Sequence, residues 1–449
     1  MDKRKGNTES KACSIMDVLG FIIKKITERV KMKLLFFGLL MFGFHLLEAQ
    51  TPKAWNLIQQ KCTPCHDNSG IAPYNFANFR EVYYNSKTIV YCLQKNIMPL
   101  WFANPKQRHF YNERVLSESD KQEIIQWVEK LNEKSLQKFQ TELVANPVFG
   151  ESNFPLPDRV ISISNTYHFT ELSDQIFLSF RKSPSPVTSY LKGANIRYSD
   201  NSVVHHGVVY GIDSTNPVYQ SADTLSHFVQ GNTFGDFTIG VYAPGVNYAL
   251  LPDGFGYSVG AVKGLLFETH ILGLNDTVAL TSSAELFFCT EKKVREVKTI
   301  NLASLDEKGP ILPNTVKTYH GSYRLNDSIS VMSLMPHMHK LAVSFHSYAV
   351  TPGHDTIPLL DLEKWSFEWQ TIYRLEKMLV LPQHTVIHYK ASFDNTANNP
   401  ENPSNPPEKV WVNQSWSTKN EMLIFGVQYV HYRSGDSGQE LKWVSLTPQ

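Results

Sequence analysis

Cysteine is scarce in this chain. Its 449 residues include five cysteines: Cys13, Cys62, Cys65, Cys92 and Cys289. Five cysteines, only two of them close together, are too few for a disulfide scaffold, so that class is excluded. An excess of charge is also missing, because 43 Lys and Arg residues stand against 42 Asp and Glu residues with no long basic run. We therefore expect no nucleic-acid partner.

A long apolar run is absent as well. The longest stretch near the N-terminus, LLFFGLLMFGFHLL, has 14 residues and ends at Leu47. It is too short to span a bilayer but suits the core of a secretory signal, with Lys31 and Lys33 before it and Ala49 after it. We predict an N-terminal extension and signal peptide over 1–49, Met32 as the true start, and export to the periplasm or another extracytoplasmic compartment. An uncleaved signal that anchors the chain in the membrane is the alternative.

The patterns that are present divide the chain. Residues 50–140 show helical spacing, and Ser117 followed by Asp120 predicts the N-terminus of a helix. A linker rich in Pro and Asn follows at 141–158. From 159 onward, short alternating runs such as TVIHYKASF (385–393) predict strands with one buried face. This length suits two sandwiches, a first over 159–300 and a second over 301–449.

The motif CTPCH gives the first chemical signal. Cys62, Cys65 and His66 match the c-type haem attachment pattern, in which two thiols bind the haem vinyl groups and the histidine binds iron. A zinc site needs a second ligand pair, and a redox dithiol needs a βαβ setting; neither is visible. Met98 is the expected sixth ligand, with His109 as the alternative. We therefore predict one covalently bound haem c on a small all-α cytochrome c-like domain.

Histidines in the β region give the second signal. His205 and His206 are adjacent, so both can reach one metal only at a strand end, bend or bulge. His270 follows on a later strand. His337 and His339 are two residues apart and share one face of a strand. In isolation, a His-x-His is more often a pair of surface or core histidines than a pair of metal ligands, so spacing alone leaves both interpretations open.

In this order, the double histidine, the lone histidine, the His-x-His and Met422 in KNEMLIF resemble the copper type II ascorbate-dependent monooxygenases, the family of peptidylglycine α-hydroxylating and dopamine β-monooxygenases. The turn LPDGFGYSVG (251–260) is similar too. The haem motif with IAP (71–73) and MPLW (98–101) resembles bacterial proteins that fuse a cytochrome to such copper domains, as does the stretch FDNTANNPENPSNPPEKVWV (393–412).

This resemblance implies two jelly-roll-type sandwiches and two copper ions. His205, His206 and His270 would hold an electron-storing copper, and His337, His339 and Met422 the catalytic copper. Dioxygen, a small organic substrate with a C–H bond to hydroxylate, and an external reductant, either ascorbate-like or a redox protein, are the implied partners. The haem bound by Cys62, Cys65, His66 and Met98 would relay electrons to the coppers.

The chain departs from the peptide-amidating relatives near the expected substrate. Met335 stands where they carry an arginine, and Ile424 and Gly426 replace polar side chains. We therefore expect a more apolar pocket and no peptide amidation. Two rival functions stay open: a haem-containing electron-transfer or copper-binding protein without hydroxylase activity, and an interaction module with vestigial ligands.

Overall fold

The computed structural model describes residues 52–66, 72–145, 155–169, 175–182, 189–220, 237–243, 249–271, 277–303, 305, 309–367, 369–413 and 419–445. The predicted signal segment and Met32 lie outside these residues, as does Ile71. Within the described part of the chain, no helix is both long and apolar enough to cross a membrane.

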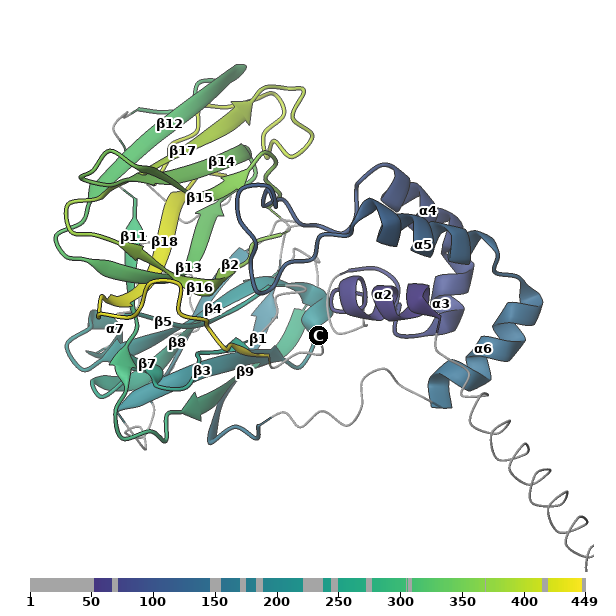
Figure 1. The fold of residues 1–449 in the computed structure, drawn as a ribbon, viewed down its shortest axis with the longest axis horizontal. Helices are drawn as coiled ribbons and strands as arrows, with labels where there is room; N and C mark the ends of the chain where they lie inside the picture. The colour runs from purple at the N-terminus through teal and green to yellow at the C-terminus, as the bar shows by residue number, and fades with distance from the viewer. Residues whose placement is uncertain are drawn as a thin grey trace, which may run out of the picture. The chain divides into compact units, whose positions relative to one another are not determined.

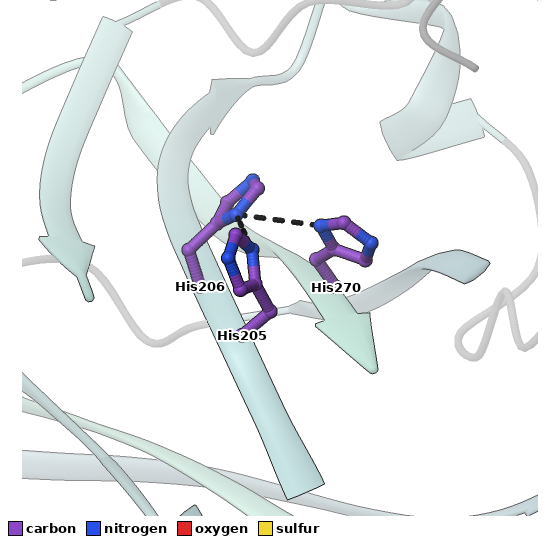
Figure 2. A group of neighbouring side chains, drawn as sticks. All are labelled: His205, His206 and His270. Atoms are coloured by element: carbon purple, nitrogen blue, oxygen red, sulfur yellow. Dashed lines mark hydrogen bonds between the residues drawn. The ribbon is translucent and has the colours of Figure 1, made fainter. Parts of the chain in front are cut away.

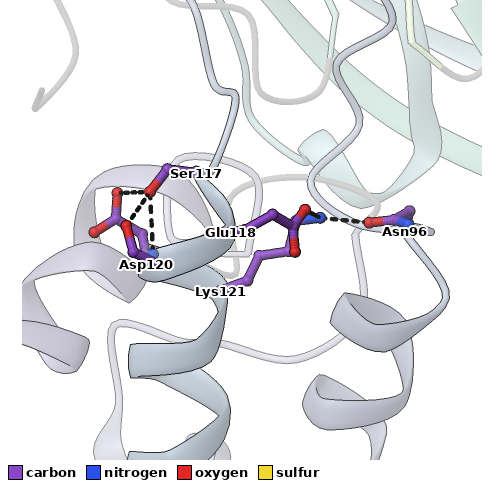
Figure 3. A network of polar contacts seen from close by, with 6 residues as sticks. Asn96, Ser117, Glu118, Asp120 and Lys121 are labelled. Carbon is purple, nitrogen blue, oxygen red and sulfur yellow. Dashed lines mark hydrogen bonds and ion pairs between the residues drawn. The ribbon is translucent and has the colours of Figure 1, made fainter.

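Among the described residues, five helices precede the sheets: α2 (Lys53–Lys61), α3 (Phe79–Tyr84), α4 (Ser86–Gln94), α5 (Glu118–Glu129) and α6 (Glu133–Ala145). The predicted start of α5 is confirmed, because the Ser117 hydroxyl accepts a hydrogen bond from the Asp120 N–H at 3.1 Å (Figure 3). Lys121 then contacts both Glu118 in its own helix and Asn96 after α4. Trp55, Phe79 and Ile124 lie in the small core between these helices.

The predicted fold class, an all-α cytochrome c-like domain followed by two jelly-roll sandwiches, is wrong. The described chain is mainly β-sandwich sheet with six short helices, the sixth being α7 (Pro217–Gln220), and no all-α cytochrome-like domain is evident in it. The helices belong to the same compact unit, Lys53–Gln449, as the sheets. Helix α6 also reaches Ala145, inside the predicted linker.

The physical reason lies between α4 and α5. There the chain is extended and packs on the C-terminal strands, with bridges from Ala103 to Leu362 and from Phe110 to Leu375. Ala103 and Phe110 are buried in the core of the second sandwich. Part of the segment that we expected to complete a separate helical domain therefore completes a β core instead.

The first sandwich has two sheets with a shared core. The five-stranded sheet has the order β1-β9-β3-β7-β10, and the four-stranded sheet the order β2-β8-β4-β5 (Figure 1). Their bounds are β1 (Arg159–His168), β2 (Gln175–Lys182), β3 (Tyr190–Tyr198), β4 (Val204–Asp213), β5 (Phe237–Tyr242), β7 (Phe255–Ser258), β8 (Val262–Ile271), β9 (Thr277–Phe288) and β10 (Arg295–Glu296). Ile163, Ile196 and Phe267 from the two sheets meet in one core.

The second sandwich has two four-stranded sheets, β11-β18-β13-β16 and β12-β17-β14-β15. Their bounds are β11 (Lys298–Leu302), β12 (Thr315–Arg324), β13 (Ile329–Met338), β14 (Ala342–Val350), β15 (Thr356–Leu362), β16 (Tyr373–Leu381), β17 (Val386–Asn395) and β18 (Leu423–His431). The predicted alternation in β17 is confirmed: Ile387, Tyr389, Ala391 and Phe393 are all buried.

The chain passes from the first sandwich to the second between β10, which pairs with β7, and β11, which pairs with β18. It later returns, since β19 (Val444–Ser445) pairs with β6 (Ala249–Leu250). An ion pair between half-buried Arg295 of β10 and buried Asp436 also joins the two sandwiches, with two hydrogen bonds at 2.7 and 2.8 Å.

Candidate metal centre

The first histidine set is built by two paired strands. His205 and His206 lie at the start of β4, and His270 lies one residue before the end of β8. These strands are antiparallel with His206 opposite His270, and their register shifts between Val204 and His206. Such a bulge inserts one extra residue into the strand, so the side chains of neighbouring residues can lie on the same side of the sheet. The expectation that the adjacent histidines would sit at a strand end or bulge is confirmed.

The three imidazoles converge on one point. The Nδ1 atoms of His205 and His206 are 2.9 Å apart, and those of His206 and His270 are 3.4 Å apart (Figure 2). Nitrogen ligands about 2.0–2.1 Å from a tetrahedral metal ion are separated by about 3.3 Å. The arrangement therefore fits an ion that all three nitrogens share, and it is the one group of metal-binding side chains found among the described His, Cys, Asp and Glu residues.

Burial favours the neutral form of two of these rings. All three side chains are buried. Burial lowers the pKa of His206 and of His270 well below the usual range, and the neighbouring histidines lower both further. Neutral imidazole is the form that binds a metal, so little energy is needed to deprotonate His206 and His270 before an ion binds.

The second histidine set lies at the end of β13. His337 is in the strand and His339 is just beyond its last residue, with ring centres 5.3 Å apart. The His337 Nδ1 lies 2.7 Å from the Gln370 side-chain oxygen, and the His339 Nδ1 lies 2.8 Å from the Asn420 carbonyl oxygen. With Nδ1 donating to these oxygens, each ring keeps Nε2 for a ligand bond. Burial also lowers the pKa of both rings, that of His339 to about 3.

Met422 is tied to this set through the backbone. The Glu421 carboxylate accepts hydrogen bonds from the N–H groups of His339, at 2.9 Å, and Leu341, at 2.6 Å. Met422 is the residue before β18, whose Leu423 pairs with Met338. Met422 is buried and lines the same cavity as His337. The structure thus places the predicted thioether ligand beside the His-x-His turn.

The two histidine sets are in contact. The rings of His206 and His337 are 6.5 Å apart, centre to centre. Phe367, from the loop between β15 and β16, stacks on His205 at 4.6 Å and an angle of 20°, and lies 5.9 Å from His339. We expected two centres in two adjacent sandwiches; the structure joins their ligands into one continuous site.

A cavity of about 340 Å³ opens beside both sets. His206, His337 and Met422 line it together with apolar side chains, among them Val208, Val241, Met335 and Ile424. The carboxylate in this lining is Glu268, which accepts a hydrogen bond from the Tyr210 hydroxyl at 3.1 Å. Burial raises the pKa of Glu268 to about 7, although this hydrogen bond opposes the shift. The cavity can hold a small, mainly apolar molecule.

The predicted haem ligands lie among the helices. Cys62, Cys65 and His66 directly follow α2, and neither cysteine forms a disulfide. The His66 Nδ1 lies 2.5 Å from the Pro73 carbonyl oxygen, a contact that fixes the orientation of the ring. The Cys65 sulfur accepts a hydrogen bond from Arg114 at 3.0 Å. These residues fit the chemistry of covalent haem attachment.

The two candidates for the sixth ligand differ in exposure. Met98 is half-buried in the loop after α4, whereas His109 is exposed and pairs with Glu113 at 3.0 Å. His109 is therefore the poorer candidate.

Sequence reasoning missed four supporting residues. Phe367, Gln370, Asn420 and Glu421 orient or contact the ligands, yet their spacing from the histidines follows no strand or helix period. A signal was available only for Asn420 and Glu421, which directly precede Met422. Trp365 and Trp369 belong to the same loop as Phe367; Trp369 is buried and Trp365 packs against the second core.

Comparison with known proteins places the chain in no family. No family model matches it, and no curated protein matches it. Among solved structures, it is similar to a structure of infectious bursal disease virus Gx strain, with a TM-score of 0.18 and 11% identity over 65% of this chain and 78% of that chain. A T13 particle of the same virus gives a TM-score of 0.16 and 9% identity over 69% and 87%. Scores this low carry no argument about fold or function.

Proposed function

We propose that this protein is a copper-dependent monooxygenase that hydroxylates a C–H bond of a small organic molecule. The observation that carries the proposal is the contact between a three-imidazole cluster and a His-x-His/Met set, both beside one largely apolar cavity. The same ligand order underlies the resemblance to the copper type II ascorbate-dependent monooxygenases. We interpret the chain as a relative of that family with a different substrate pocket.

The donor sets support copper at both positions. Three imidazoles suit copper, which heads the affinity order of the divalent ions. The thioether of Met422 is a soft ligand and favours Cu(I), the form that meets dioxygen. Copper, when bound, would supply one-electron chemistry and dioxygen activation. His205, His206 and His270 would hold the electron-storing ion, and His337, His339 and Met422 the catalytic ion.

The chain's own residues would then place the substrate. The apolar cavity walls exclude water from the reacting carbon and favour an apolar body next to His337 and Met422. Met335 and Ile424 line this cavity and offer no partner for a carboxylate. A glycine-extended peptide is therefore a poor substrate, and a small molecule with few charges is the better one.

Hydroxylation of the substrate by dioxygen consumes two electrons from an external donor. One oxygen atom of dioxygen enters the substrate, and the other leaves as water after taking up two electrons and two protons. We propose that a haem bound by Cys62, Cys65 and His66, with Met98 as sixth ligand, delivers these electrons one at a time. This attachment implies an exported protein, since haem of this type is attached outside the cytoplasm.

The test uses the full mature chain, purified with copper. We expect two coppers and one haem per chain, oxygen uptake with a reductant, and transfer of one labelled oxygen atom from dioxygen into a product found by screening small metabolites. Matched variants are His337→Ala, which should abolish uptake, and His320→Ala, an exposed histidine of the same sandwich, which should not alter it.

The outcomes separate the rival functions. Copper and haem without oxygen uptake on any substrate would identify an electron-transfer or copper-binding protein. A chain that binds neither copper nor haem would favour the remaining rival, an interaction module with vestigial ligands. Haem that stays reduced while substrate is hydroxylated would exclude the relay.

A further inference from the structure

Glu268 is an unusual residue for the place that it occupies. It lies on β8, its surface is only 5% exposed, and its side chain lines the cavity beside the two histidine sets. Among the described residues, no Lys or Arg side chain pairs with it. A glutamate is rarely buried without a cation, because nothing then offsets the loss of hydration around its charge. The position therefore indicates a role beyond packing.

The Glu268 carboxylate has unused capacity to accept hydrogen bonds. The Tyr210 hydroxyl, on the neighbouring strand β4, donates to its Oε2 atom at 3.1 Å. A carboxylate can accept hydrogen bonds at both oxygens, with about four lone-pair sites in all. In the described part of the chain, the Tyr210 bond is the one that the Glu268 side chain makes. A molecule in the cavity therefore meets an acceptor that Tyr210 holds in place.

The lining around this acceptor is mainly apolar. Val208 lies opposite Glu268 in the pairing of β4 with β8 and opposite Val241 in the pairing of β4 with β5, and both valines line the cavity. The second sandwich contributes Met335 and Ile424 to the same lining. Ligand sites commonly combine an apolar lining with a few polar groups that fix the orientation of the ligand. Glu268 is placed to be such a group.

We propose that Glu268 determines the specificity of the cavity by accepting a hydrogen bond from a hydroxyl group on an otherwise apolar substrate. A substrate carboxylate would be repelled by Glu268, and an ether oxygen has no hydrogen to donate. An ammonium group is disfavoured because metal ions at His206 and His337, which line the same cavity, would repel a second cation. This inference deepens the proposed function by naming the substrate class, small apolar alcohols. The exclusion of ammonium rests on the proposed metal ions, whereas the choice of a donor rests on Glu268 alone.

The test is a calorimetric titration of the full chain, purified with copper, with two probes of equal size. Hexan-1-ol can donate a hydrogen bond, whereas methyl pentyl ether, with the same number of heavy atoms, cannot. The unaltered chain should bind the alcohol at least about 10-fold more tightly than the ether, the usual contribution of one hydrogen bond to a carboxylate. Hexanoate and hexylammonium ions should both bind more weakly than the alcohol.

Variants of Glu268 test its role directly. Glu268→Gln keeps the shape and an oxygen for Tyr210 but presents an NH₂ group, which can donate to the oxygen of either probe, so alcohol and ether should bind alike. Glu268→Leu offers no acceptor and should also lose the preference. The matched control is Glu285→Gln in the same sandwich, outside the cavity lining, where the carboxylate accepts a hydrogen bond from Asn195 at 2.7 Å; it should keep the preference. Circular dichroism and the melting temperature check that the variants are folded.

Each outcome decides between this role and a purely structural pair of Glu268 and Tyr210. Equal binding of the alcohol and the ether by the unaltered chain, or no binding of either, would overturn the proposal. A preference that survives in Glu268→Gln would overturn it too. Tighter binding of hexylammonium than of hexan-1-ol would overturn the choice of a hydroxyl group. Failure of the chain to bind copper would instead defeat the proposed function, and the alcohol and the ether can still be compared on that chain.

Discussion

The two histidine sets are held in place by different means. In the first set, strand pairing and a bulge bring three Nδ1 atoms together, so the ligand atoms face one another directly. In the second set, each Nδ1 faces an oxygen, from Gln370 or Asn420, and the Glu421 side chain holds the backbone N–H groups of His339 and Leu341. The first is organised by the sheet itself; the second depends on hydrogen bonds from loops. Changes in loops should therefore weaken the second set and leave the first intact.

The largest expected effect comes from His206→Ala, which removes the central imidazole of the first set. We expect the loss of one copper per chain, measured by elemental analysis, with the second copper retained. His168→Ala is the matched control, because this exposed histidine of the first sandwich bonds only to Thr277 among the contacts described for it. Simultaneous loss of both coppers would show that the sets form one centre and would contradict the view that they are organised independently.

Asp436→Asn should weaken the contact between the two sandwiches that carry the histidine sets. Asp436 accepts two hydrogen bonds from Arg295 of the first sandwich and one from Ser330 of the second. Breaking a buried ion pair typically costs about 3–5 kcal/mol of unfolding free energy. Urea denaturation measures this loss, and Asp355→Asn, at an exposed turn, should change it little.

The same carboxylate makes the stability of the folded protein depend on pH in the acid range. Burial by itself would raise the pKa of Asp436, but the hydrogen bonds from Arg295 and Ser330 outweigh it and hold this pKa at about 2, below the ordinary 3.8. The folded state thus binds fewer protons than the unfolded state between these values. The stabilisation is present above about pH 4 and disappears as the pH falls towards 2. An Asp436→Asn protein whose stability falls over this range as steeply as that of the unaltered chain would contradict this assignment.

Glu421→Gln should affect only the second set. A glutamine offers one acceptor oxygen, so one of the two N–H groups of His339 and Leu341 would face an amide NH₂ instead. An unsatisfied buried N–H costs about 1–3 kcal/mol of unfolding free energy. Displacement of this turn should also lower the copper affinity of the second set. Calorimetric copper titration separates the two sites, with Glu440→Gln, an exposed position, as the control. Equal weakening of both coppers would contradict the independence of the sets.

Gln370→Leu gives the most specific test of loop dependence, because it changes one hydrogen bond to one ligand ring. It removes the oxygen that orients the His337 ring while leaving every proposed ligand in place. Loss of such a supporting contact usually weakens metal binding by about 10–100-fold. The same titration should show this change at the second copper alone, and exposed Gln383→Leu should show none. If the copper affinity of the second set were unchanged, packing and not the Gln370 oxygen would orient the His337 ring.

Several parts of the structure could be predicted from sequence because they depend on local rules. The cap at Ser117 is set within four residues, and the alternation in β17 follows the two-residue period of a strand. The need for a bulge at His205 and His206 follows from the same period, because neighbours on a regular strand point to opposite faces.

The contacts that could not be predicted join segments far apart in the chain. Phe367 and Gln370 belong to an aperiodic loop, and nothing in their spacing indicates that they reach histidines of both sandwiches. The helical domain was overestimated for a related reason. The composition of 101–112 gives no sign that Ala103 and Phe110 are buried in a β core formed more than two hundred residues later.

That extended segment has a practical consequence for dissecting the protein. Trp101 and Phe110 pack edge-on against Tyr373, and Asn112 exchanges hydrogen bonds with Ile372 and Arg374. A fragment trimmed to begin at 159 would strip these aromatic rings from the second sandwich and leave its interior open to solvent. The helices and the two sandwiches should therefore be expressed as one piece, because residues 101–112 belong to the core of the second sandwich.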